Sequence, residues 1–231
     1  HVTGGEKMRK IFEEELQDLH VLFSEMGKMV NEAIYISVKG FVNHDKELAA
    51  EVIAHDVAIN QREAEIEKRC FELIALHQPV TGNLRRIVTI MKACADLERM
   101  ADHAVSIAKS TIRVKGNKRN SDIEAAIAEQ SEKVKVMVEE VLAAYIKTDI
   151  EKAKEVALSD KMVDQAAEHI YGRAIEEMKL DPELVLGATD YIMVAGYLER
   201  IGDYVTNICE WIIYLGTGKI IELNTNNKFE D

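Results

Sequence analysis

The strongest constraint on the fold is a six-residue signature that the 231-residue chain contains twice. Residues 97–102 read LERMAD and residues 198–203 read LERIGD, so the copies stand 101 residues apart, a little under half the chain. The two prolines repeat at a similar offset, and residues 51–56 match residues 155–160 at an offset of 104. Nearly constant offsets indicate an internal duplication. The sequence therefore predicts two units of almost equal length.

Each unit is predicted to be helical. Two prolines and twelve glycines are too few for the many turns of a β-sandwich or barrel, and long segments are dense in Ala, Leu, Ile, Glu and Lys. Apolar periodicity and helix-capping residues predict six helices, so the fold class is all-α. The first helix is expected over residues 8–40, and the second follows a cap at Asn43 or Asp45 and ends at 76. The third covers 83–114, and the fourth is capped by Ser121 or Asp122 and ends near 147. Asp149 opens the fifth, and a break at 181–182 precedes the sixth.

Two pseudosymmetric three-helix bundles follow from this division, one over residues 8–114 and one over residues 122–223. Residues 1–7 are expected to be an expression tag or a loose terminus, and the polar residues 224–231 a disordered tail. The basic residues 115–119 are interpreted as a solvated linker between the bundles.

Charge and composition exclude several classes of protein. A net charge of −12 argues against nucleic acid as a partner, because that binding depends on neutralising phosphates. No apolar run is long enough to predict a membrane span. Three scattered cysteines favour a reducing, cytoplasmic setting. The sequence lacks a Walker loop, a Gly-x-Gly-x-x-Gly motif, a nucleophile elbow and a thiol–imidazole signature, so no catalytic residue and no enzyme activity are predicted.

The acids of the repeated signature are the candidate functional residues. Each copy carries two acids four positions apart, which stack on one helix face and repel by about a few tenths of a kcal/mol unless a cation joins them. Each unit has a second polar pair early in its middle helix. If the middle and last helices pack antiparallel, the two pairs meet, and their oxygens suit magnesium, manganese, calcium or ferric iron. The candidate metal ligands are Glu98, Asp102, Asp56 and Asn60 in the first unit and Glu199, Asp203, Asp160 and Asp164 in the second.

Other interpretations of these acids were weighed. The chain has 41 acids, so spacing-four pairs arise often and are usually solvated or paired with Lys or Arg. Recurrence at equivalent places in both units favours metal binding. A ferritin-like di-iron site is excluded, because no histidine follows a glutamate by three positions. His103 could add a nitrogen ligand, but Tyr204 occupies its place in the second unit, and His55 is expected on the surface.

The doubled signature resembles that of the PhoU family, regulators of phosphate uptake and of the phosphate-starvation response. The resemblance rests on residues 96–103 (DLERMADH), 198–208 (LERIGDYVTNI) and 8–16 (MRKIFEEEL), and it spans the chain from about residue 8 to 223. It implies multinuclear metal centres of iron, manganese, magnesium or zinc on Glu/Asp-x-x-x-Asp motifs. Asn60 departs from that motif, whereas Asn207 adds an amide beside the second acidic pair. The second centre is therefore expected to be the stronger one.

The resemblance also implies a function and partners. It predicts a cytoplasmic, homodimeric adaptor that reaches the membrane through its partners, the ATPase of the phosphate ABC transporter and a phosphate-sensing histidine kinase. The adaptor would restrain both partners when phosphate is plentiful. Two alternatives stay open: a redox bundle that stores or oxidises iron, and a metal-free structural adaptor whose acids are only solvated.

Overall fold

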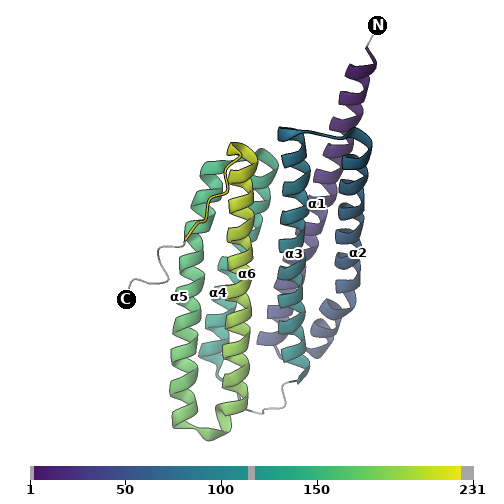
Figure 1. Ribbon diagram of the computed structural model, residues 1–231. Helices are drawn as coiled ribbons and strands as arrows, with labels where there is room; N and C mark the ends of the chain where they lie inside the picture. Colours follow the sequence, from purple (N-terminus) through teal and green to yellow (C-terminus); the bar gives the residue numbers. More distant parts are fainter. Residues whose placement is uncertain (1–2, 114–117, 225–231) are drawn as a thin grey trace.

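The computed structural model describes residues 3–113 and 118–224, and over these ranges the chain is all-α, as predicted. Six long helices and one short 3₁₀ helix account for the fold (Figure 1). Their bounds are α1 Gly4–Val42, α2 Lys46–His77, α3 Thr81–Arg113, α4 Ser121–Lys147, α5 Ile150–Leu180, η1 Pro182–Leu184 and α6 Val185–Thr217.

The helices form two three-helix bundles that lie side by side. Helices α1, α2 and α3 pack on one another, as do α4, α5 and α6, and the bundles meet where α3 packs on α6 and α1 packs on α4 (Figure 1). The signature helices α3 and α6 thus stand next to each other at the boundary between the bundles. Within the described residues, every helix is too polar or too short to cross a membrane.

The helix boundaries follow local capping chemistry. Asp45 and Asp149 cap α2 and α5 as predicted, each accepting a hydrogen bond from a backbone N–H in the first turn. Helix α4 is capped by Asn120, whose Oδ1 accepts from Ile123 N at 3.0 Å, so the expected caps at the next two positions were wrong. Helix α1 begins at Gly4, four residues earlier than expected, because Thr3 caps it and continues the helix into the predicted loose terminus.

The hydrophobic core runs through both bundles and includes a reciprocal exchange of aromatic rings. Tyr145 at the end of α4 is fully buried against the first bundle, with its ring centroid 4.5 Å from that of Phe23 on α1. Phe41 at the end of α1, which matches Tyr145 at the repeat offset of 104, packs edge-on against Tyr191 of α6 at 6.0 Å. Each bundle therefore contributes a ring to the other.

The described residues of the segment between the bundles, Lys118 and Arg119, are exposed, as a solvated linker predicts, and they also form ion pairs. Residues 114–117 lie outside the described residues, but Lys118 forms ion pairs with Asp181 and Glu183, and Arg119 donates to Glu124 at 2.9 Å. Glu124 is only 3% exposed, so a cation is needed beside it, and the linker supplies that cation.

Asn224, the first residue of the predicted disordered tail, contacts α5. The side chain of Asn224 donates to Ala157 O of α5 at 2.8 Å, and residues 225–231 lie outside the described residues.

Candidate metal centres

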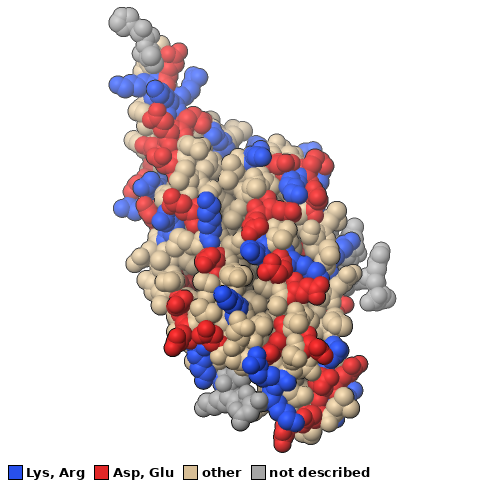
Figure 2. Space-filling view, turned by 180° about the vertical axis from the view of Figure 1, so that it is seen from behind, with Lys and Arg blue, Asp and Glu red and all other residues tan. Residues whose placement is uncertain are grey.

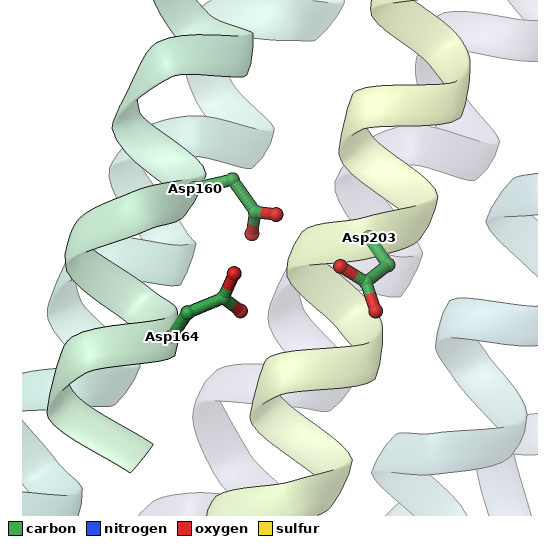
Figure 3. Close-up of side chains that lie close together, drawn as sticks. All are labelled: Asp160, Asp164 and Asp203. Atoms are coloured by element: carbon green, nitrogen blue, oxygen red, sulfur yellow. The ribbon is translucent and has the colours of Figure 1, made fainter. Parts of the chain in front are cut away.

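The second bundle brings together three carboxylates that the sequence predicted to meet. Asp160 and Asp164 lie one turn apart on α5, and Asp203 faces them from α6 (Figure 3). One oxygen of each lies within 4.8 Å of the others. Asp160 is 4% exposed and the other two are half-buried, so the cluster lies in the contact between two packed helices.

Two further residues expected in this second cluster have partners of their own. Glu199, one turn before Asp203, accepts a long hydrogen bond of 3.5 Å from the Tyr171 hydroxyl, and burial together with the glutamate raises the pKa of Tyr171 to about 12. Asn207 reaches across to α3, where its side-chain amide donates to Asp96 Oδ1 at 3.4 Å. The expectation that Asn207 joins the second cluster is therefore wrong, because it bridges the two bundles.

The first bundle places its four predicted residues on α2 and α3, in a more open arrangement. Asn60 donates its side-chain amide to Asp56 Oδ2 at 3.3 Å, and both Asn60 and Asp102 are exposed. Burial, then the charge of Asp102, raises the pKa of Asp56. Burial also raises the pKa of Glu98 to about 7, with further increases from a hydrogen bond and charge repulsion by Asp102.

Glu63 is a member of the first cluster that sequence reasoning missed. Burial, followed by the charges of Glu67 and Asp102, raises its pKa, and its own charge helps to raise that of Glu98. It follows Asp56 by seven residues, two helical turns, and so shares its helix face. The repeat concealed this signal, since the second bundle has Ala167 at the matching place. Glu63 offsets the negative charge that is missing at Asn60.

The two histidines considered as ligands lie elsewhere. The His103 ring stacks on Tyr197 and Tyr204 of α6, with centroids 5.9 and 5.6 Å away, so it packs between the bundles. Burial, then the charge of Arg200, lowers its pKa. His55 is exposed, as expected for a surface residue. The three cysteines are buried and free, and burial raises the pKa of Cys70 and Cys209 to about 12, which keeps these thiols protonated.

The donor set of both clusters fits a hard cation. Each cluster combines carboxylates from two neighbouring helices, and oxygen donors are the ligands that Mg²⁺, Mn²⁺ and iron ions favour. Two local observations agree. Asp56 Oδ1 is buried without a hydrogen-bond partner among the described residues, and the Asp160 carboxylate occupies a space that a side chain at Gly202 would fill. A bound cation would offset the repulsion and join α2 to α3 and α5 to α6.

Known proteins resemble this chain over nearly its whole length. The family model described as the PhoU domain matches it twice, at residues 23–111 and 127–212. The phosphate-specific transport system accessory protein PhoU homolog of Clostridium acetobutylicum is 40% identical over 94% of this chain and 99% of its own length. The Escherichia coli accessory protein PhoU is 30% identical over 95% of this chain and 88% of its own.

Solved structures show the same architecture. The crystal structure of the phosphate transport system regulatory protein PhoU from Streptococcus pneumoniae superposes with a TM-score of 0.86 at 34% identity. It covers 92% of this chain and 100% of that one. The structure of PhoU from Pseudomonas aeruginosa gives a TM-score of 0.83 at 33% identity, over 90% of this chain and 100% of its own.

Proposed function

This chain belongs to the PhoU family, and on that premise we propose that it is a metal-binding regulatory accessory protein of a phosphate transport system that acts by docking rather than by catalysis. The observation that carries the metal-binding part is the group of Asp160, Asp164 and Asp203, whose oxygens converge within 4.8 Å from two helices. Two helices joined at such a point form a stiffer docking surface than two helices that repel there.

The ion is proposed to be a hard cation. All donors in the two clusters are carboxylate or amide oxygens, which favour manganese, magnesium or iron. Zinc ranks lower, because structural zinc sites in proteins mostly use thiolate and imidazole ligands. Held by acids from α2 and α3, or from α5 and α6, the ion would stabilise the antiparallel packing of these helices.

The proposed partners are the ATPase of the phosphate ABC transporter and a phosphate-sensing histidine kinase, both restrained when phosphate is plentiful. The protein would be cytoplasmic, homodimeric and held at the membrane by these partners. Two faces of the protein are candidates for docking these partners. One carries the acidic clusters. The other has a groove of about 650 Å³ between α1 and α4, which is lined by apolar Leu142 and Ile146 together with Lys28, Lys135 and Glu139, on the face seen in Figure 2.

Metal content tests the ligand assignment. Replacing Glu199→Ala with Asp203→Ala should lower the metal bound by the purified protein by about half, because one of two centres loses its α6 ligands. Glu176→Ala, an exposed acid three turns beyond Asp164 and on another face of α5, is the matched control and should leave metal content unchanged. Equal metal content in the double variant and the wild type would contradict the assignment.

Recovery of partners tests the regulatory role. Affinity-tagged protein expressed in its native cells at high phosphate should co-purify with an ABC-transporter ATPase, and should release it when the cells are starved of phosphate. Oxygen-dependent oxidation of ferrous iron by the purified protein, with no ATPase recovered, would instead support an iron-handling bundle and contradict the proposal.

A further inference from the structure

Gly202 lies at the point where α6 meets the acids of α5. It is buried, and it directly precedes Asp203 in the second signature. A Cβ atom built on Gly202 would overlap Asp160 Oδ1 and would lie 3.6 Å from Val163 Cγ1. The buried Asp160 side chain is short, with two rotatable bonds, so its carboxylate could make room only by turning away from α6.

The first bundle has a methyl group at the matching position. Ala101 is 1% exposed and corresponds to Gly202 in the signature. The counterpart of Asp160 is Asp56, which is half-buried and bonded to the Asn60 amide, whereas Asp160 is 4% exposed. The bundle with glycine thus has the deeper aspartate, and the bundle with alanine has the shallower one.

We propose that Gly202 is a positioning residue that sets the geometry of the second centre. The absence of a Cβ atom lets the Asp160 carboxylate lie against α6 beside Asp203, where both can bind the same cation. In the first centre the methyl group of Ala101 fills the place that the Asp160 carboxylate takes beside Gly202. The second centre is therefore the tighter site for a hard cation. This inference rests on the metal binding proposed above.

Gly202 could instead serve only to let α5 and α6 pack closely. Glycine-to-alanine changes elsewhere in the same bundle distinguish this packing role from the positioning role. A Cβ at Gly216 on α6 would overlap Ile150 Cδ1 at the start of α5, so Gly216→Ala crowds the α5–α6 contact away from Asp160. A Cβ at Gly172 on α5 meets nothing within 4 Å. Gly172→Ala therefore reports the ordinary gain in helix propensity alone.

Mn²⁺ binding to the whole chain, freed of metal by chelation, tests the proposal. Titration calorimetry, with free Mn²⁺ followed by electron paramagnetic resonance, should show that Gly202→Ala weakens the tighter class of sites by about tenfold or more, as loss of a supporting contact typically does. Gly172→Ala and Gly216→Ala should keep that affinity. Circular dichroism melting of the metal-free variants establishes that each is folded.

A double-mutant cycle shows whether Gly202 acts through Asp160. Asp160→Ala should weaken the tighter sites, and adding Gly202→Ala to it should cause no further loss, because the overlapping carboxylate is gone. A full additional loss in the double variant would overturn the proposal in favour of a packing role.

The converse change in the first bundle keeps the proposal testable even if Gly202→Ala does not fold. Ala101→Gly added to Asn60→Asp should bind Mn²⁺ more tightly at the weaker class of sites than Asn60→Asp alone does, and equal affinity in these two variants would overturn the positioning role. If the folded Gly202→Ala variant binds Mn²⁺ as tightly as the wild type does, the inference about Gly202 is overturned and the proposed metal function is not affected. A wild-type protein that binds no Mn²⁺ would overturn the proposed metal function itself.

Discussion

Single side chains distinguish the two acidic clusters. In the second cluster the deepest carboxylate, Asp160, lies beside Asp164 of the same helix and faces Asp203 across the α5–α6 contact. In the first, burial is the largest cause of the perturbed pKa: burial, then a hydrogen bond with Asp102 and the charges of Asp102 and Glu63, raise the pKa of Glu98 to about 7. A carboxyl group with a raised pKa holds its proton more tightly in the folded state, so its ionisation destabilises the metal-free fold.

Glu98→Gln should therefore stabilise the metal-free protein at high pH. The unfolded pKa is near 4.5 and the folded one near 7, so the cost of the charge is absent below pH 4.5, grows between these values and is complete above pH 7. Because Glu98 is partly exposed, the gain at pH 8 should be on the order of 1 kcal/mol. Urea unfolding with chelator at pH 5 and pH 8 measures it. The same gain at pH 5 and pH 8 would show that it does not come from removing the charge of Glu98.

Tyr145→Phe should be neutral or stabilising. The Tyr145 hydroxyl is buried without a hydrogen-bond partner among the described residues, and removing such a group can recover up to about 1 kcal/mol. Tyr191→Phe is the control, because the Tyr191 hydroxyl donates to Glu124 at 2.8 Å and accepts from Asn120 N at 2.9 Å. It should cost about 1–2 kcal/mol in urea unfolding. An equal loss in both variants would be inconsistent with an unpartnered hydroxyl.

Sequence reasoning found the residues that occur in both repeats and missed those that occur in one. Asp160, Asp164 and Asp203 were predicted to meet because antiparallel packing brings the start of the middle helix near the latter part of the last helix. Glu63 was missed because it has no acidic counterpart, and Asn207 was misplaced. A helix-face argument gives the direction of a side chain but not which neighbouring helix it reaches.

At the helix ends, interactions within one turn could be predicted from the sequence, whereas interactions between distant segments could not. Asp45 and Asp149 could be identified as caps from sequence, because a cap bonds to its own first turn. The network around Glu124 could not, since its partners come from separate parts of the chain. At the start of α4 this carboxylate accepts from His44 of the α1–α2 turn at 2.8 Å, from Tyr191 of α6 at 2.8 Å and from Arg119 at 2.9 Å.

Glu124→Gln should destabilise the protein at neutral pH. Burial alone would raise the pKa of Glu124, but hydrogen bonds from Arg119, His44 and Tyr191 outweigh burial and lower it. A lowered folded pKa means that the stabilisation is present above the unfolded pKa and is lost as the pH falls through the folded one. The variant should lose about 2 kcal/mol at pH 7, as expected for bonds to a charged group.

Denaturant unfolding of the wild type and of Glu124→Gln at pH 7 and pH 3.5 tests whether the loss comes from the charge of Glu124. The difference in unfolding free energy between wild type and Glu124→Gln should shrink at pH 3.5, because that pH lies below the unfolded pKa of 4.5 and the unfolded chain has already taken up the proton. A difference of the same size at both pH values would assign the loss to packing instead. Glu129→Ala elsewhere on α4 serves as a control, and a surface change of this kind should stay within about 0.5 kcal/mol.

The whole molecule is more than two bundles joined by a linker. The duplication indicates two equal units, and that is what the helices form. The exchange of Tyr145 and Phe41 makes each core depend on the other bundle, while Asn207 and Asp96 join α6 to α3. The repeat contained this signal, because both aromatic residues end the first helix of their unit. Sequence periodicity could not reveal it, since a buried position does not show which bundle buries it.

The chain should therefore unfold as one cooperative unit. Without Tyr145, the first bundle has a gap beside Phe23 in its core, and deleting a buried aromatic ring typically costs about 3–5 kcal/mol, much of the stability of a domain. Residues 1–117 expressed alone should show no cooperative thermal transition by circular dichroism, and mixing them with residues 118–231 should restore one. The intact chain should melt in a single step. Native-like melting of residues 1–117 alone would show instead that the duplicated units are independent domains, and that the exchanged rings add little to the stability of either.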